Sequence, residues 1–199
     1  MKYIALTLTL YNLIFSLDLR DIENIKKWNR LQDQPVTIEW CVFENFPISK
    51  AEAILNHNIH SIAQAIQDLD NYPNIFDRVT RTHQLGENIV HIILDMPFPF
   101  EGRDYIVKYS TNKKPGYWMF SYSSFEDNIP LEQDHVRLPN AAGVWILYQI
   151  SKDTTKVIYA WNGQLLGNFP DFGLEKAWIT QGTEVLNWLD QAMRQKIES

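Results

Sequence analysis

The order of the predicted elements constrains this chain more than any other feature: many strand-like segments precede a single long amphipathic segment. Between residues 79 and 161, short runs of β-branched and aromatic residues alternate with turn signals, as in an antiparallel sheet. Residues 172–197 instead carry apolar side chains at helical spacing, namely Leu174, Trp178, Val185, Leu189 and Met193. Because such a sheet must cover its apolar face, this order predicts one long helix laid across a curved sheet.

The individual segments follow from hydrophobic periodicity and turn residues. Strands are predicted over residues 36–43, 79–85, 89–96, 105–110, 117–123, 134–138, 143–150 and 156–161. Short helices are predicted over residues 21–30 and 61–69, residues 48–55 fit either a strand or a helix, and TNKKPG (residues 111–116) predicts a loop. The fold class is therefore α+β, a helix-grip fold in which a curved antiparallel sheet wraps around the C-terminal helix.

Composition narrows the classes of protein further. Among 199 residues, 24 acidic side chains outnumber 18 basic ones, and the net charge of −6 argues against a nucleic-acid partner. The hydrophobic fraction of 45% is too high for a disordered chain, and the length suits one domain, expected to be a monomer. The single cysteine, Cys41, can form neither an internal disulfide nor a cysteine zinc cluster, and we expect it to be buried.

Residues 1–16 have the pattern of a secretory signal peptide, with a positive charge at Lys2, a short apolar stretch and a small residue at Ser16. The apolar stretch is shorter than the ~20 residues that a membrane-spanning helix needs. A buried first helix is the alternative interpretation. We expect a signal peptide over residues 1–16, a single domain over residues 17–199 and export of the chain. If the N-terminus is retained, the protein would stay in the cytoplasm.

Four segments of the chain resemble the START (StAR-related lipid-transfer) family, within the helix-grip superfamily. They are LDNYPNIFDRV (residues 69–79), DMPFPFEGRDYIV (95–107), VRLPNAAGVWILY (136–148) and GNFPDF (167–172). The segments occur in the family's order and spacing, and the resemblance covers roughly residues 28–193. With the leader peptide, the chain is similar to the exported bacterial members, which implies a periplasmic protein.

This resemblance implies a non-enzymatic pocket that binds, or transfers, a lipid or other apolar small molecule without a cofactor. It also implies a gate, formed here by residues 111–116 and the C-terminal helix. Sterol-binding members place an interior arginine six positions after the arginine of the Arg103-Asp104 motif, where this chain has Tyr109. Their acidic partner falls on the preceding strand, where this chain has Val90-His91-Ile92, so the charged pair is missing.

Aromatic side chains on the predicted strands are the candidate ligand contacts. Tyr105 and Tyr109 share one strand face, and Lys108 lies on the opposite face, which favours an inward position for the tyrosines. An aromatic row is also typical of an ordinary core, and His91, in the apolar run IVHIIL, fits a core histidine as well as a ligand contact. The candidate ligand-binding residues are His91, Tyr105, Tyr109, Trp118, Phe120, Trp145 and Trp178.

Two other functions remain open from the sequence. An enzyme of the same superfold, such as a polyketide cyclase or hydrolase, would need His91, Asp104 and Tyr109 to meet in one pocket. An interaction module would instead have its pocket filled by its own aromatic rings. The sequence contains no nucleophile elbow, phosphate-binding loop, dinucleotide fingerprint or zinc-helix motif, so no catalytic or metal-ligating residue is expected. Lys113 and Lys114 could make a transient contact with anionic lipid head groups.

Overall fold

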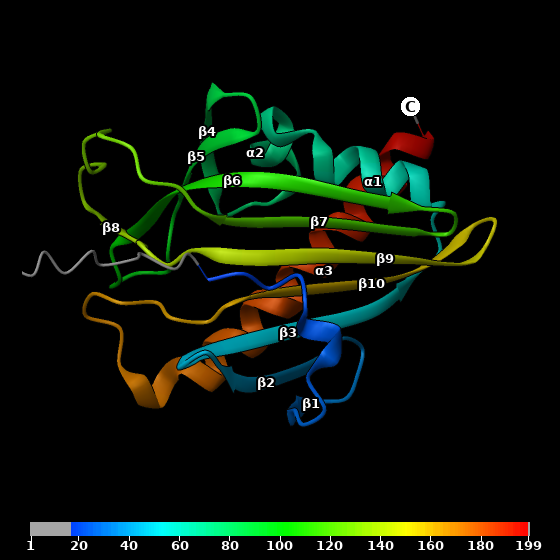
Figure 1. Cartoon of the computed structure of the whole chain (residues 1–199), viewed down its shortest axis with the longest axis horizontal. Coiled ribbons are helices and arrows are strands. Elements are labelled where there is room, and N and C mark those ends of the chain that lie inside the picture. The colour runs from blue at the N-terminus through cyan, green and yellow to red at the C-terminus, as the bar shows by residue number, and fades with distance from the viewer. Residues whose placement is uncertain (1–16, 199) are drawn as a thin grey trace, which may run out of the picture.

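The computed structural model describes residues 17–198, and within them ten strands form one curved sheet (Figure 1). The strands are β1 (Asn29–Gln32), β2 (Thr37–Phe43), β3 (Phe46–Leu55), β4 (Val79–Gly86), β5 (Ile89–Leu94), β6 (Gly102–Lys114), β7 (Tyr117–Ser124), β8 (His135–Arg137), β9 (Ala142–Ser151) and β10 (Thr154–Asn162). Their order is β1-β2-β3-β10-β9-β7-β6-β5-β4, with antiparallel neighbours. β8 pairs in parallel with the start of β6.

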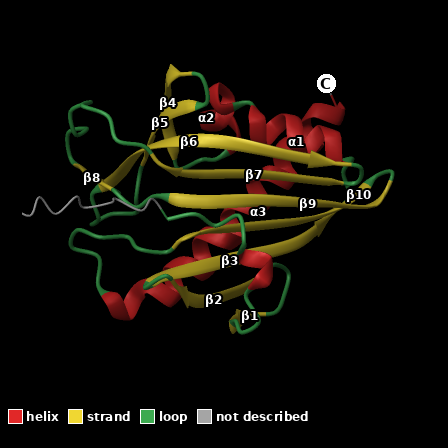
Figure 2. Ribbon diagram, viewed as in Figure 1, coloured by secondary structure: helices red, strands yellow, loops and turns green. Residues whose placement is uncertain are grey.

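The helices of the described residues lie mainly on one face of this sheet. They are α1 (Ile59–Gln67), α2 (Tyr72–Ile75) and α3 (Leu174–Glu198), with 3-10 turns η1 (Ile22–Asn24), η2 (Leu69–Asn71) and η3 (Asp171–Gly173). Figure 2 shows α3 running diagonally across the sheet and ending beside α1. The side chain of Asn58 begins α1 by accepting the backbone N–H of His60 at 2.8 Å.

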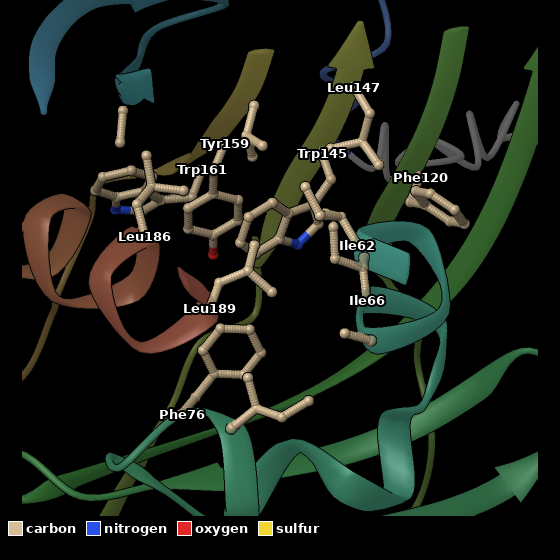
Figure 3. Packing of buried hydrophobic residues seen from close by; sticks show 14 of the residues in the cluster. Ile62, Ile66, Phe76, Phe120, Trp145, Leu147, Tyr159, Trp161, Leu186 and Leu189 are labelled. Atoms are coloured by element: carbon tan, nitrogen blue, oxygen red, sulfur yellow. The ribbon is translucent and has the colours of Figure 1, made fainter. Parts of the chain in front are cut away.

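The concave face of the sheet carries the larger apolar core. Side chains of α1 and α3 meet those of β9 in this core, as Figure 3 shows for Ile62, Ile66, Trp145, Leu186 and Leu189. Gly182 allows α3 to approach the sheet closely, because a Cβ there would lie 2.6 Å from Ile38 Cδ1 and 3.0 Å from the Cβ of Ala51. Gly182 therefore lets α3 lie close to β2 and β3.

The convex face is covered by the segment that precedes β1. Leu17, Leu19 and Ile22 are buried there against a second apolar cluster that includes Ile146. Cys41 belongs to the same cluster, and burial raises the pKa of its thiol. Because both faces of the central strands are covered, the apolar runs of β7 and β9 are nearly continuous rather than alternating.

The fold class and the long C-terminal helix are confirmed, and residues 48–55 belong to a strand, β3. The helix predicted over residues 21–30 is wrong. Only Ile22–Asn24 form a 3-10 turn, and β1 starts at Asn29. The apolar residues of that segment do not line one helical face. Instead they cover the convex face as an irregular chain, in which Trp28 lies 4.2 Å from the Lys50 ammonium.

The loop predicted over residues 111–116 is also wrong, because β6 continues to Lys114. Lys114 pairs with Tyr117, so only Pro115 and Gly116 form the turn, and Gly116 has a φ of 69°. The Lys113 ammonium lies 4.0 Å from the centre of the Trp118 ring. This contact accommodates the charged side chain within the hairpin. The predicted signal peptide, residues 1–16, lies outside the described residues. Within the described part, no helix is long and apolar enough to cross a membrane.

Candidate functional site

A cavity of about 500 Å³ lies between the sheet and the first half of α3. Its walls come from β6, β7, β9 and β10, from α2 and α3, and from the loops at residues 95–101 and 163–173. The volume falls within the ~300–1,000 Å³ typical of small-molecule sites. An interior filled by its own aromatic rings, as an interaction module would have, does not fit this volume.

The strand register explains the shape of the sheet wall. Tyr109, Tyr122, Gly143 and Trp161 form one row across four neighbouring strands. A Cβ at Gly143 would lie 2.3 Å from the Tyr122 hydroxyl, so the glycine leaves room for the Tyr122 ring to lie over β9. Any larger residue at Gly143 would push this tyrosine into the cavity.

Buried tyrosines supply much of the polar surface of the cavity. The Tyr122 and Tyr159 hydroxyls are 2.9 Å apart, and the Tyr72 hydroxyl donates to the Ile66 carbonyl at 2.7 Å. Burial raises the pKa of Tyr105, Tyr109 and Tyr122 well above the usual value, and raises that of Tyr159 to about 12. These hydroxyls are therefore neutral at physiological pH.

Two loops face each other at one end of the cavity, which we call the mouth. The rings of Phe100, before β6, and Phe169, before α3, lie 4.6 Å apart between their centres. Beside them Phe98 is 98% exposed and Phe172 is 93% exposed. Removing such exposed rings from water would be favourable, so they mark the mouth as an apolar surface that could contact an apolar partner.

Arg103 joins the two mouth loops from inside the protein. Its side chain is 1% exposed and makes no ion pair among the described residues. It donates instead to backbone carbonyls of both loops, at 2.5 Å to Glu101, 2.5 Å to Leu165 and 3.0 Å to Leu166. Burial lowers the pKa of this guanidinium, although it stays charged at physiological pH. The arginine thus fixes the positions of both loops relative to β6.

By sequence, the chain matches no protein-family model and no curated protein. By structure, it matches the STAR-related lipid transfer protein of Xanthomonas axonopodis with a TM-score of 0.73 and 17% identity, covering 85% of this chain and 99% of that one. Human STARD10 matches with a TM-score of 0.74 and 15% identity, covering 86% of this chain and 74% of that one. The chain has the START-like helix-grip fold.

A more distant START-like neighbour is the Zhui aromatase/cyclase from Streptomyces sp. R1128. Its TM-score is 0.52 at 10% identity, over 75% of this chain and 94% of that one. Identities this low show a shared fold, and the function of this chain must be argued from its own cavity.

Three of the predicted ligand-binding residues line the START-like cavity: Tyr105, Tyr109 and Trp145. Their contact with a ligand stays a prediction. His91 does not line it, because its pairing with Ile106 places the side chain on the convex face. There His91 lies 2.8 Å from Asp104, which also accepts two hydrogen bonds from Arg137. His91 is a core histidine rather than a ligand contact.

The other three predicted residues are also outside the lining. Trp118 and Phe120 lie on the concave face beyond the end of the cavity, where α1 covers them and the His60 ring meets Trp118 edge-on at 5.8 Å. The Trp178 indole N–H donates to the Gly163 carbonyl at 2.8 Å, and its ring packs against Trp40 at 5.3 Å. Packing among elements of the fold, rather than a cavity, therefore accounts for these rings.

The acid–base set required by the enzyme alternative is not assembled. His91 and Asp104 meet on the convex face, whereas Tyr109 lines the cavity on the other side of the sheet. No cluster of histidine, cysteine and carboxylate side chains that could hold a metal occurs in the described residues. These three residues therefore do not form the single pocket that the enzyme alternative requires.

Several lining residues were missed by sequence reasoning. Tyr122, Tyr159 and Trp161 line the cavity. Alternation along β7 places Tyr122 on the same face as Trp118 and Phe120, whereas the face of Tyr159 follows only from its pairing with Trp145. Tyr72 reaches the cavity from α2, and the residues of the two mouth loops reach it from irregular segments. No periodic pattern could have identified those positions.

Proposed function

We propose that this protein binds a lipid or other apolar small molecule in the cavity between its sheet and α3. The observation that carries this proposal is a cavity of about 500 Å³ lined mostly by aromatic and aliphatic side chains. Each Å² of apolar ligand surface removed from water contributes about 25 cal/mol, so few polar contacts are needed for binding. Two structural neighbours named as STAR-related lipid transfer protein and STARD10 share this fold and support the proposal.

The residues that line the cavity fit the binding of a ligand better than its chemical conversion. Among the described residues that line the cavity there is no histidine, cysteine, serine or aspartate. Its carboxylate, Glu184, accepts two hydrogen bonds at 2.8 Å from Arg78. Of the other groups that can act in general acid–base catalysis, the lining holds Lys176, which is exposed, and tyrosine hydroxyls, whose pKa burial raises.

We place the route for the ligand at the mouth, between Phe100 and Phe169. The exposed rings of Phe98 and Phe172 flank this opening and would enter the surface of a membrane first. Lys113 and Lys114, the other candidates for membrane contact, lie at the far end of β6, roughly 40 Å along the strand from its first residue. A membrane contact at those lysines would leave the mouth far from the lipid.

Export remains part of the proposal. If residues 1–16 are a cleaved signal peptide, the protein isolated from its own cells should start near Leu17. Its intact mass measures this directly. A chain that retains Met1 or Lys2 would place the protein in the cytoplasm instead.

The binding function can be tested with N-phenyl-1-naphthylamine, an apolar probe whose fluorescence rises outside water. We expect saturable binding of one probe per chain and its displacement by added lipids. Val185 lines the cavity, and Val185→Trp should fill part of it and weaken probe binding at least tenfold. Asn187 is exposed on the same helix, so Asn187→Trp is the matched control and should bind as the wild type does.

The two variants separate the cavity from other binding surfaces. Equal probe binding by Val185→Trp and wild type would place the probe elsewhere and contradict the proposal. Absence of saturable binding to the wild-type protein would contradict it as well. Circular dichroism of both variants confirms that each is folded.

A further inference from the structure

The outer surface of the mouth carries apolar side chains that the fold leaves uncovered. The rings of Phe98 and Phe172 are almost fully exposed, and Leu131 and Leu166 are exposed on loops nearby. Figure 1 shows the loop before β8 and the loop before α3 at the same end of the sheet. Exposed apolar groups gathered in this way mark a surface that contacts another molecule.

Carboxylates lie on the same loops as the exposed rings. The segments at this end are residues 95–101, 125–134 and 163–176, the last of which includes the first residues of α3. The Gly102 N–H, next to the first segment, donates to the Asp134 carbonyl of the second at 3.2 Å. The exposed acidic side chains, which we call the carboxylate rim, are Asp95, Glu101, Glu126, Asp127, Asp134, Asp171 and Glu175. Within these described segments, Lys176 is the exposed basic side chain.

The other cations at this end have partners of their own. Three arginines are each paired with a carboxylate outside the rim, namely Arg78 with Glu184, Arg81 with Glu132 and Arg137 with Asp104. Arg103 and Glu101 both lie beside Gly167, but the hydrogen bonds of this buried guanidinium go to backbone carbonyls. The His135 ring lies 4.0 Å from Asp95. Because these groups offset only part of the rim, the surface around the rings keeps an excess of negative charge.

We propose that the mouth docks onto a basic surface of a partner protein. Apolar side chains of the partner cover Phe98 and Phe172, and its lysine and arginine side chains face the carboxylate rim. An apolar centre within a charged border is the usual anatomy of such an interface, and the complementary charges steer the approach and fix the orientation. This inference goes beyond ligand binding, because it concerns the outer surface and does not depend on what the cavity holds.

Charge distinguishes this partner from other surfaces. A membrane would accept the two rings, but anionic lipid head groups would repel the carboxylates beside them. A second copy of the chain, docked symmetrically through the mouth, would bring the same carboxylates against one another. The phosphates of a nucleic acid would be repelled in the same way. A basic protein is the partner for which the rings and the carboxylates both favour contact.

The test uses two synthetic helical peptides that share the same leucine positions on one face. One carries lysine at every polar position, and the other carries glutamate. In isothermal titration calorimetry at low salt, we expect saturable binding of the lysine peptide to the wild-type protein and no binding of the glutamate peptide. Added sodium chloride should weaken the binding, because salt screens the exposed charges. Vesicles of phosphatidylglycerol should bind more weakly than the lysine peptide.

Variants at the mouth locate the binding surface. Asp171→Lys combined with Glu175→Lys reverses two charges beside Phe172 and should weaken binding of the lysine peptide at least tenfold. Phe98→Ser, on the facing loop, should weaken it by a similar factor through the loss of apolar contact. Circular dichroism confirms that each variant is folded.

The matched controls change the same kinds of residue away from the mouth. Asp153→Lys combined with Glu87→Lys reverses two exposed charges in the turns after β9 and β4, and Ile54→Ser removes an exposed apolar side chain from β3. All of these variants should bind the lysine peptide as the wild type does. Val185→Trp should also bind it unchanged, because the peptide contacts the mouth and not the cavity.

Several results would overturn the inference. They are absence of binding to the lysine peptide, equal binding of both peptides, and unchanged affinity in either mouth variant. Stronger binding to phosphatidylglycerol vesicles than to the lysine peptide would assign the mouth to a membrane instead, and a loss of affinity in Val185→Trp would place the peptide in the cavity. Failure of the wild-type protein to bind N-phenyl-1-naphthylamine would contradict the proposed function and leave this inference standing.

Discussion

Arg103 and Asp104 occupy opposite faces of the same strand, and each organises a different part of the molecule. Arg103 lines the cavity and holds the mouth loops through their backbone carbonyls. Asp104, 0% exposed, accepts hydrogen bonds from His91 and Arg137 and so attaches β8 to the convex side. Strand alternation predicts their opposite directions. Their partners depend on loops and on a parallel strand pair that the sequence pattern does not reveal.

Replacement of Arg103 should loosen the mouth. Arg103→Lys keeps the positive charge but cannot reach carbonyls of both loops, since an ammonium lacks the planar fork of a guanidinium. We expect faster amide hydrogen exchange over residues 163–169 and a loss of about 2–4 kcal/mol in the free energy of unfolding. Exchange at β2 serves as the internal reference. Unchanged protection of residues 163–169 would show that the loop is held by other contacts.

The ionisation of Asp104 should make the free energy of unfolding depend on pH in the acid range. Burial alone would raise its pKa, but the hydrogen bonds from Arg137 and His91 outweigh this and hold the pKa below its usual value. The stabilisation is therefore complete above about pH 4, near the pKa of the unfolded chain, and is lost as the pH falls through the lower folded value. We expect Asp104→Asn to be less stable than wild type by about 3 kcal/mol at pH 7.

Urea unfolding at pH 7 and pH 3 measures this difference. It should shrink at pH 3, which lies below the pKa of the carboxyl in the unfolded chain, because the stabilisation by the charge falls as the pH drops toward the lower folded value. An equal difference at both pH values would mean that the charge of Asp104 is not what stabilises the cluster.

At the scale of elements, the role of a residue in α3 becomes clear only when the sheet against which the helix packs is known. Helix propensity alone predicts that Gly182 weakens the middle of this helix, since glycine costs about 1 kcal/mol relative to alanine. In the structure the same residue lets the helix touch β2 and β3 through Ile38 and Ala51. The missing side chain thus allows the close approach of helix and sheet at this point.

Gly182→Ala should therefore destabilise the protein although alanine favours helices. The added Cβ would lie 2.6 Å from the flexible end of Ile38 and 3.0 Å from Ala51, so the helix or the sheet must move. We expect a net loss of about 1–2 kcal/mol in the free energy of unfolding, measured with urea. Asn187→Ala, at an exposed position of α3, should instead be neutral or slightly stabilising. Stabilisation by Gly182→Ala would show that the contact is not tight.

The two mouth loops form the second element whose behaviour can be measured. If the ligand passes through the mouth as proposed, the ring contact between Phe100 and Phe169 must open, and an aromatic pair contributes about 0.5–1.5 kcal/mol. Phe169→Ala should raise the dissociation rate of N-phenyl-1-naphthylamine about fivefold in stopped-flow measurements. Ile150→Ala, at the exposed end of β9, should leave the rate unchanged. Equal rates in wild type and Phe169→Ala would place the ligand route elsewhere.

At the scale of the whole molecule, the sequence predicted the layers of the fold better than the limits of the cavity. Alternation along β6 correctly put Tyr105 and Tyr109 on one face, because that inference needs only one strand. The position of His91 required the register between β5 and β6, and that of Trp118 required knowing that α1 covers the hairpin end of the concave face. Both depend on tertiary pairing, which periodicity does not encode.

The central claim is that the cavity holds an apolar ligand, and native mass spectrometry of the protein purified from its own cells tests it most directly. We expect the chain to carry one bound molecule in the wild-type protein and in Asn187→Trp, and to be largely empty in Val185→Trp. The mass of the chain alone in every sample, or equal occupancy in Val185→Trp, would contradict the claim.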